Sequence, residues 1–139
     1  MVQQLDEWLE TLPLNGDYPC ISEARRFQHD EFNYDVQYEN KPEDIDVGRG
    51  AVGFSREYGV DTDGPALEIG CGTGLLSLGL VNENVFPAVL LTDPSPAFLN
   101  ITRCKLKHAG VNSYTARYAL LQGEDTDRLP ENTFSLIAL

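Results

Sequence analysis

Three glycines at alternate positions constrain this chain more than any other feature, because they directly follow an apolar stretch. The stretch is Ala66–Ile69, and the glycines are Gly70, Gly72 and Gly74. Glycine lets the backbone turn tightly and lets a ligand approach main-chain atoms that a side chain would cover. The run 74–81 then predicts a helix, whose start presents unpaired N–H groups. The segment therefore predicts a strand, a nucleotide-type binding loop and a helix in succession.

The spacing of these glycines distinguishes between cofactors. The dinucleotide fingerprint G-x-G-x-x-G needs its third glycine where this chain has Leu75. The spacing therefore argues against NAD or FAD, although a variant fingerprint leaves an NAD-dependent oxidoreductase open as an alternative.

Two carboxylates accompany the loop. Glu68 stands in an otherwise apolar strand, where an uncompensated charge is costly, so it should meet hydrogen-bond donors or a cation at the carboxyl end of the strand. Asp93 ends a second apolar run, 88–92, and lies 19 residues past Gly74. An acidic residue at about this distance accepts hydrogen bonds from ribose hydroxyls in dinucleotide sites. Together, a cation and a ribose are the ligand groups that these two residues predict.

The pattern resembles the class I, Rossmann-like S-adenosylmethionine-dependent methyltransferases, whose first motif is an acidic residue, one spacer and G-x-G-x-G. ALEIGCGTG at 66–74 matches this motif fully. LLTDPSP at 90–96 is similar to the second-strand motif of the family. LLQGEDTDRLPENTFSLIAL at 120–139 is similar to the third and fourth strands of its small-molecule branch, although Ser135 stands where the family often has Asp.

The resemblance implies a set of cofactor-binding residues: Glu68, Gly70, Cys71, Gly72, Gly74, Asp93, Pro94, Glu124 and Asp125. Glu68 would serve the methionine end of S-adenosylmethionine, Asp93 the ribose and Pro94 a side of the adenine. Either Glu124 or Asp125 would face the adenine amino group, and the other would be a solvated loop residue. No catalytic residue is assigned, and no cluster has the spacing of a metal site.

The sequence before residue 60 predicts a helical segment. The pattern predicts helices at 2–12, 22–38 and 51–58 and a loop at 40–50. Asp61–Pro65 is a boundary signal, so we expect an N-terminal helical segment at 1–60 and a cofactor-binding domain at 61–139.

The remainder alternates between strands and helices. Strands are predicted at 66–69, 88–92, 118–122 and 134–139. Between them, Ser95 as N-cap, Pro96 at the first helical position and Gly110 as a left-handed stop delimit a helix. Such alternation implies parallel strands. The expected fold class is α/β, a Rossmann-like three-layer sandwich with a mostly parallel sheet.

The resemblance places the fourth strand beside the first, in the middle of the sheet. A chain ending at Leu139 would expose the outer edge of that strand. We therefore expect a sheet that is incomplete in its C-terminal half, with its edge covered by a missing C-terminal half or by a second copy in a homo-oligomer.

Charge and cysteine content limit the partners. The formal net charge is −12, and residues 1–63 carry 15 acidic against 5 basic residues. Such a surface repels phosphate backbones and anionic lipid, so we expect no nucleic-acid and no membrane partner. Cys20, Cys71 and Cys104 are odd in number and widely spaced, which favours a reducing, cytoplasmic location.

These observations predict methyl transfer from S-adenosylmethionine to a small-molecule acceptor, with this chain supplying the cofactor-binding half. A non-catalytic S-adenosylmethionine-binding or regulatory module is the alternative on the same fold.

Overall fold

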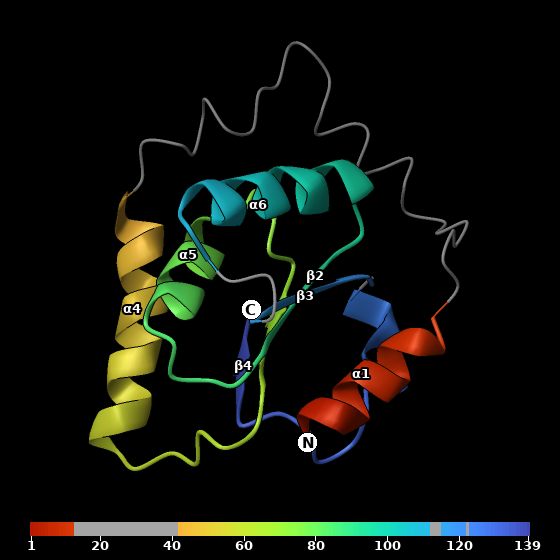
Figure 1. Ribbon diagram of the computed structural model, residues 1–139, viewed down its shortest axis with the longest axis horizontal. Helices are drawn as coiled ribbons and strands as arrows, with labels where there is room; N and C mark the ends of the chain where they lie inside the picture. The colour runs from red at the N-terminus through yellow and green to blue at the C-terminus, as the bar shows by residue number, and fades with distance from the viewer. Residues whose placement is uncertain (13–41, 112–114, 122) are drawn as a thin grey trace.

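Four parallel strands form a single sheet in the part of the chain that the computed structural model describes, which comprises residues 1–12, 42–111, 115–121 and 123–139 (Figure 1). The strands are β1 (Ala66–Ile69), β2 (Val89–Asp93), β3 (Ala116–Leu120) and β4 (Leu136–Ala138). Their spatial order is β3-β2-β1-β4, and all three pairings are parallel. The order reverses at β1, and the carboxyl end of such a strand is where open α/β sheets bind ligands.

Helices cover both faces of this sheet (Figure 1). One face carries α4 (Pro42–Glu57), α5 (Leu75–Asn82) and α6 (Pro96–His108). The opposite face carries α1 (Val2–Glu10) and the 3-10 helix η1 (Gly123–Arg128). The expected three-layer α/β architecture, with its incomplete parallel sheet, is therefore confirmed.

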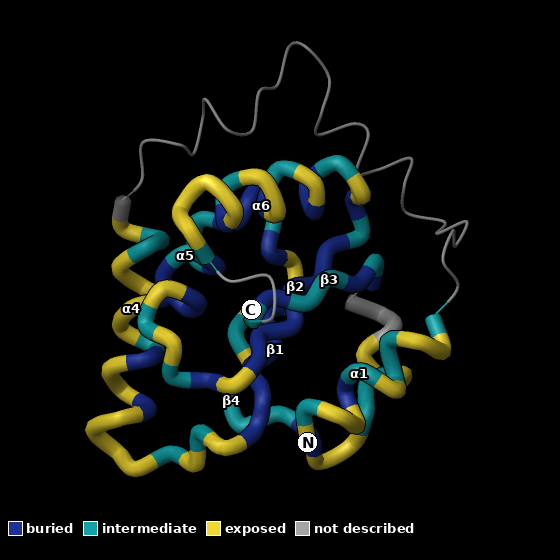
Figure 2. The backbone as a smooth tube through the Cα atoms, in the orientation of Figure 1, coloured by how far each residue is buried: buried dark blue, intermediate teal, exposed yellow. Residues whose placement is uncertain are grey.

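The strands alternate their side chains between two apolar cores. In β2, Leu90 and Leu91 are both fully buried, and they belong to the cores on opposite faces of the sheet. This period of two is what a strand buried on both faces requires. Figure 2 shows the buried residues concentrated along the sheet and the exposed ones on the outer sides of α4 and α6.

The N-terminal helix α1 packs on the face that α4, α5 and α6 leave open. Leu5 is fully buried there, and the indole N–H of Trp8 donates a 2.7 Å hydrogen bond to the carbonyl of Arg128. Asp6 forms an ion pair of 2.7 Å with Arg117 of β3, and this bond lowers the pKa of Asp6. Val2, Trp8 and Leu9 also pack against the core on this face, and the helix predicted at 2–12 is confirmed as α1.

The loop predicted at 40–50 is wrong, because α4 begins at Pro42 and continues through this segment. Proline at the start and Glu43 and Asp44 in the first turn favour a helix N-terminus. Its glycines suggested a loop, yet Gly48 meets α5 where a side chain would collide with the carbonyl of Leu76. The helix predicted at 51–58 is the second half of α4, and the one predicted at 22–38 lies outside the described residues.

The helix predicted between Ser95 and Gly110 begins and ends as expected. The Ser95 hydroxyl accepts a 3.2 Å hydrogen bond from the N–H of Phe98, Pro96 is the first residue of α6, and Gly110 follows with a φ of 76°. The third strand begins earlier than expected, at Ala116, because the Asp6 carboxylate compensates the charge of Arg117 within it.

Within the described ranges, no helix combines the length and the apolar character that crossing a membrane requires.

Candidate functional site

The glycine loop connects the carboxyl end of β1 to α5. Gly70, Gly72 and Gly74 all have positive φ, at 73°, 54° and 88°. A side chain on Gly74 would crowd Thr102 of α6, its Cβ lying 2.7 Å from the Thr102 methyl carbon, whereas one on Gly70 would meet no atom within 4 Å. The third glycine thus serves close packing, and the first leaves open space beside the loop.

The middle glycine is held from two sides. The N–H of Gly72 donates a 2.9 Å hydrogen bond to Oδ2 of Asp93, at the end of β2. The carbonyl of Gly72 accepts a 2.9 Å hydrogen bond from the Thr102 hydroxyl, in α6. The loop conformation is therefore fixed by the neighbouring strand and helix before any ligand binds.

Asp93 is nearly buried, at 5% exposure, and uses both carboxylate oxygens. Oδ1 accepts a 2.8 Å hydrogen bond from the N–H of Ser95, in addition to the bond from Gly72 to Oδ2. Burial raises the pKa of Asp93, and these two bonds oppose the rise. A carboxylate offers about four acceptor sites, so each oxygen keeps one for a hydroxyl group.

Glu68 points from β1 toward α5 and is 3% exposed. Its Oε2 accepts a 2.7 Å hydrogen bond from the hydroxyl of Ser77. Burial raises the pKa of Glu68 to about 7, the bond from Ser77 opposes the rise, and the charge of Asp93 adds to it. The expected hydrogen-bond donor is thus Ser77, which is neutral and leaves the charge of ionised Glu68 without a counter-charge.

Cys71 lies in the loop but has an unreactive environment. Its side chain is 6% exposed, and its Sγ lies 4.0 Å from the Thr102 hydroxyl. Burial raises the pKa of the Cys71 thiol, and the charges of Glu68 and Asp93 raise it further. The thiol is therefore protonated at neutral pH and unsuited to nucleophilic attack.

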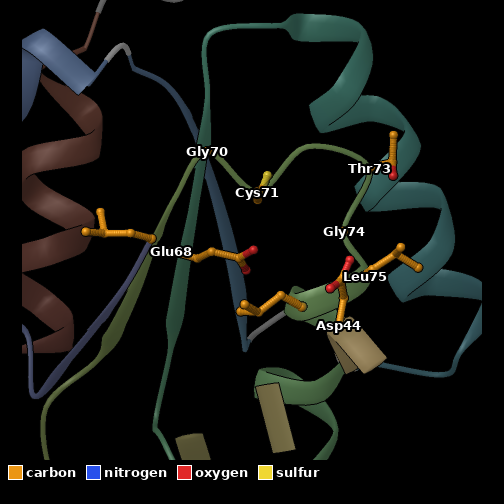
Figure 3. A pocket seen from close by; sticks show the side chains of 9 residues that line it. Asp44, Glu68, Gly70, Cys71, Thr73, Gly74 and Leu75 are labelled. Carbon is orange, nitrogen blue, oxygen red and sulfur yellow. The ribbon is translucent and has the colours of Figure 1, made fainter. Parts of the chain in front are cut away.

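A pocket of about 210 Å³ lies beside the glycine loop and Glu68 (Figure 3). It is lined by Asp44, Glu68, Gly70, Cys71, Thr73, Gly74, Leu75, Leu76 and Leu139. None of these lining residues is basic, and two are carboxylates. The volume lies below the roughly 300–1,000 Å³ of a complete small-molecule site, so it suits one end of a ligand. The described residues include no group of three or more His, Cys, Asp or Glu that could hold a metal ion.

The predicted residues occupy three places. Four of them line the pocket: Glu68, Gly70, Cys71 and Gly74. Gly72 and Asp93 are joined by their hydrogen bond, and the half-buried Pro94 follows in the turn after β2 without lining the pocket. Glu124 and Asp125 belong to η1, but their side chains lie outside the described residues.

Sequence reasoning missed three polar residues of this site. Asp44 was assigned to a loop, although Pro42 followed by two acids is a helix-start signal that would have found α4. Ser77 and Thr102 stand within helices, where a hydroxyl facing a strand or a loop has no pattern of its own. Only the packing of α5 and α6 brings them to Glu68 and Gly72.

Comparison with known proteins identifies related domains. A model of the methyltransferase domain family matches residues 67–139, more than half of the chain. No curated protein matches significantly.

Solved structures share the fold at low sequence identity. One is an S-adenosylmethionine-dependent methyltransferase from Clostridium acetobutylicum, with 21% identity and a TM-score of 0.57 over 82% of this chain and 42% of that one. Another is a putative S-adenosylmethionine-dependent methyltransferase from Methanococcus maripaludis, with 19% identity and a TM-score of 0.59 over 91% of this chain and 52% of that one. A putative sarcosine dimethylglycine methyltransferase from Galdieria sulphuraria has 16% identity and a TM-score of 0.52 over 67% of this chain and 34% of that one. The chain thus spans about half, or less, of the length of these proteins.

Proposed function

Because the chain belongs to the methyltransferase domain family, we propose that it binds S-adenosylmethionine and supplies the cofactor-binding half of an enzyme that methylates a small-molecule acceptor. The observation that carries the proposal is the pocket at the carboxyl end of β1. There the glycine loop meets the buried carboxylate of Glu68, and no lining residue is basic.

The charge of the site favours this cofactor over a dinucleotide. S-adenosylmethionine carries a sulfonium and an ammonium, which suit carboxylates. A pyrophosphate needs free N–H groups of the loop, but the N–H of Gly72 already donates to Asp93. The charge of Glu68 would also repel a phosphate group. The loop is therefore built for a cationic ligand.

Each binding residue has a proposed role. Glu68 faces the methionine end of the cofactor, and Gly70 allows its close approach because the space beside this glycine is open. Asp93 accepts hydrogen bonds from the ribose hydroxyls through its remaining acceptor sites, and Pro94 flanks the adenine. Glu124 or Asp125 accepts from the adenine amino group.

The chain contributes positioning to the reaction. When bound, S-adenosylmethionine supplies an electrophilic methyl group on its sulfonium sulfur, which an acceptor nucleophile attacks in line. The fixed loop and Glu68 orient the cofactor, and Leu75 and Leu76 keep an apolar wall beside it that excludes water. No described residue is assigned as a general base.

The acceptor class follows from charge. A chain with a formal net charge of −12 repels a nucleic-acid backbone, so we propose a small molecule. A similar fold in a putative sarcosine dimethylglycine methyltransferase is consistent with this choice. The cysteine pattern supports a reducing, cytoplasmic location as part of the same proposal.

Titration calorimetry tests the proposal. S-adenosylmethionine and S-adenosylhomocysteine are expected to bind the chain with a stoichiometry of about one, and NAD is expected not to bind. Binding of NAD without either adenosyl-sulfur ligand would contradict the proposal and favour an oxidoreductase. Transfer of a labelled methyl group from S-adenosylmethionine to a component of a small-molecule extract would exclude the non-catalytic module.

A further inference from the structure

The pocket receives a second carboxylate from an element outside the matched residues 67–139. Asp44 lies in the first turn of α4 and lines the pocket together with Glu68 of β1. Figure 3 shows the Glu68 carboxylate extending from the strand and the Asp44 carboxylate rising from the start of α4 beside the glycine loop. Two anionic groups from different layers of the fold therefore border one small space.

The position of Asp44 is set by a close crossing of α4 and α5. Gly48 is one turn after Asp44, on the same side of the helix. A side chain on Gly48 would collide with the carbonyl of Leu76, and one on Gly79 of α5 would collide with the carbonyl of Ile45. The helices thus approach to a distance that only glycine permits, and this approach brings the first turn of α4 to the rim of the pocket.

The chemistry of the space calls for one cation with several donors. Asp44 and Glu68 both line the pocket, and none of its lining residues supplies a positive charge. An ammonium group has three N–H donors, so it can serve both carboxylates at once. Of the two cationic groups of S-adenosylmethionine, the ammonium is the one with donors, and it belongs to the amino-acid end.

From this placement we infer that Asp44 is a specificity-determining residue, which holds the ammonium of the ligand's amino-acid end together with Glu68 and so ties α4 to the sheet through the ligand. The inference rests on the proposed function, since it assigns the orientation of the cofactor in the same pocket. It predicts that the chain discriminates between adenosyl ligands by their amino-acid end.

Two ligands and two variants test this assignment by calorimetry. S-adenosylhomocysteine has the ammonium, whereas 5′-methylthioadenosine lacks the whole amino-acid end. Asp44→Asn is expected to weaken S-adenosylhomocysteine about tenfold, as loss of a charged hydrogen bond implies, and to leave the affinity for 5′-methylthioadenosine unchanged. Asp46→Asn is the matched control, because Asp46 lies on the same helix but is 70% exposed and pairs with Arg49 at the surface.

The outcomes distinguish failure of the role of Asp44 from failure of the proposed function. Unchanged binding of S-adenosylhomocysteine to Asp44→Asn would overturn the role of Asp44. Equal weakening of both ligands would overturn it as well, because it would show a merely structural role. Absence of all adenosyl-ligand binding to the unmodified chain would instead overturn the proposed function itself.

Discussion

The carboxylate of Asp93 accepts a 2.9 Å hydrogen bond from the backbone N–H of Gly72, so the end of β2 holds the glycine loop that follows β1. The same carboxylate accepts from the N–H of Ser95, at the start of α6. Asp93 therefore builds the site in addition to its proposed contact with the ribose. Loop geometry and ligand affinity should fail together when this residue changes.

Replacement of Asp93 tests this double role. Asp93→Ala leaves the N–H groups of Gly72 and Ser95 without their acceptor, so we expect a loss of about 1–3 kcal/mol in the free energy of unfolding. The affinity for S-adenosylhomocysteine should fall by a similar free energy or more. Urea unfolding and calorimetry measure the two effects, and the exposed Asp127→Ala is the control. Unchanged values in both measurements would show that Asp93 is misassigned.

Removal of the Thr102 hydroxyl changes a single hydrogen bond of the same loop. Thr102→Val keeps the shape of the side chain but removes the donor to the carbonyl of Gly72, so we expect a loss of about 1 kcal/mol in the free energy of unfolding. Thr126→Val, at an exposed position, should change it little. Equal stability of the two variants in urea would contradict the role of Thr102.

The first and third loop glycines should respond differently to alanine. Both have positive φ, which costs an L-residue about 1–2 kcal/mol. Gly74→Ala adds a collision with Thr102, so it should destabilise the fold more than Gly70→Ala, whose side chain enters open space. Gly70→Ala should instead lose ligand affinity while the chain stays folded. Thermal unfolding and calorimetry separate the two effects, and full ligand binding by Gly70→Ala would show that the ligand lies elsewhere.

Glu68 should make stability depend on pH in a defined window. Its pKa rises from an ordinary value of 4.5 to about 7, so the folded state binds the proton more tightly than the unfolded chain does. The ligand-free protein should therefore lose stability as the pH increases from about 4.5 to about 7, by on the order of 3 kcal/mol. Glu68→Gln should remove this part of the pH dependence, and urea unfolding at pH 5 and pH 7.5 measures it.

Ligand binding should show the opposite dependence. A cationic ligand favours ionised Glu68, so the affinity for S-adenosylhomocysteine should increase over the same pH window, with release of a proton near pH 6.5. Calorimetry in buffers of different ionisation enthalpy detects that proton. A pH-independent affinity in the unmodified chain would remove Glu68 from the contact.

Two glycines of α4 test the close crossing with α5, because Gly48 lies at the crossing and Gly50 does not. Gly48→Ala should destabilise the protein because its side chain meets backbone atoms of α5. Gly50→Ala, on the same helix, meets no atom within 4 Å and should gain roughly 0.5–1 kcal/mol from better helix propensity. Guanidinium unfolding of the two variants provides the comparison. A neutral Gly48→Ala would show that the helices are not held this closely.

The strands could be predicted because their signals are local, and the place of the fourth strand beside the first followed from the resemblance to a known family. Each strand is a short, mostly apolar segment, and the loop that joins β1 to α5 has its glycines where positive φ is needed. The course of α4 could not be predicted in the same way. Its glycines argue for a loop when read locally, yet Gly48 is required by close contact with α5, an element that comes later in the chain.

The residues of the candidate site show the same difference between local signals and tertiary contacts. Glu68 and Asp93 were found because a carboxylate at the end of an apolar strand is unusual in itself. Ser77, Thr102 and Asp44 were missed because their importance comes from tertiary packing, which brings a helical hydroxyl or a first-turn acid against the loop. A carboxylate in an apolar strand can be recognised in the sequence, whereas the residues that contact it are known only once the helices are packed.

A crystal structure of the chain with S-adenosylhomocysteine tests the central claim most directly. We expect the ligand's ammonium within hydrogen-bond distance of the Glu68 carboxylate and its ribose hydroxyls within hydrogen-bond distance of Asp93. A ligand bound away from the glycine loop, or one whose carboxylate faces Glu68, would contradict it.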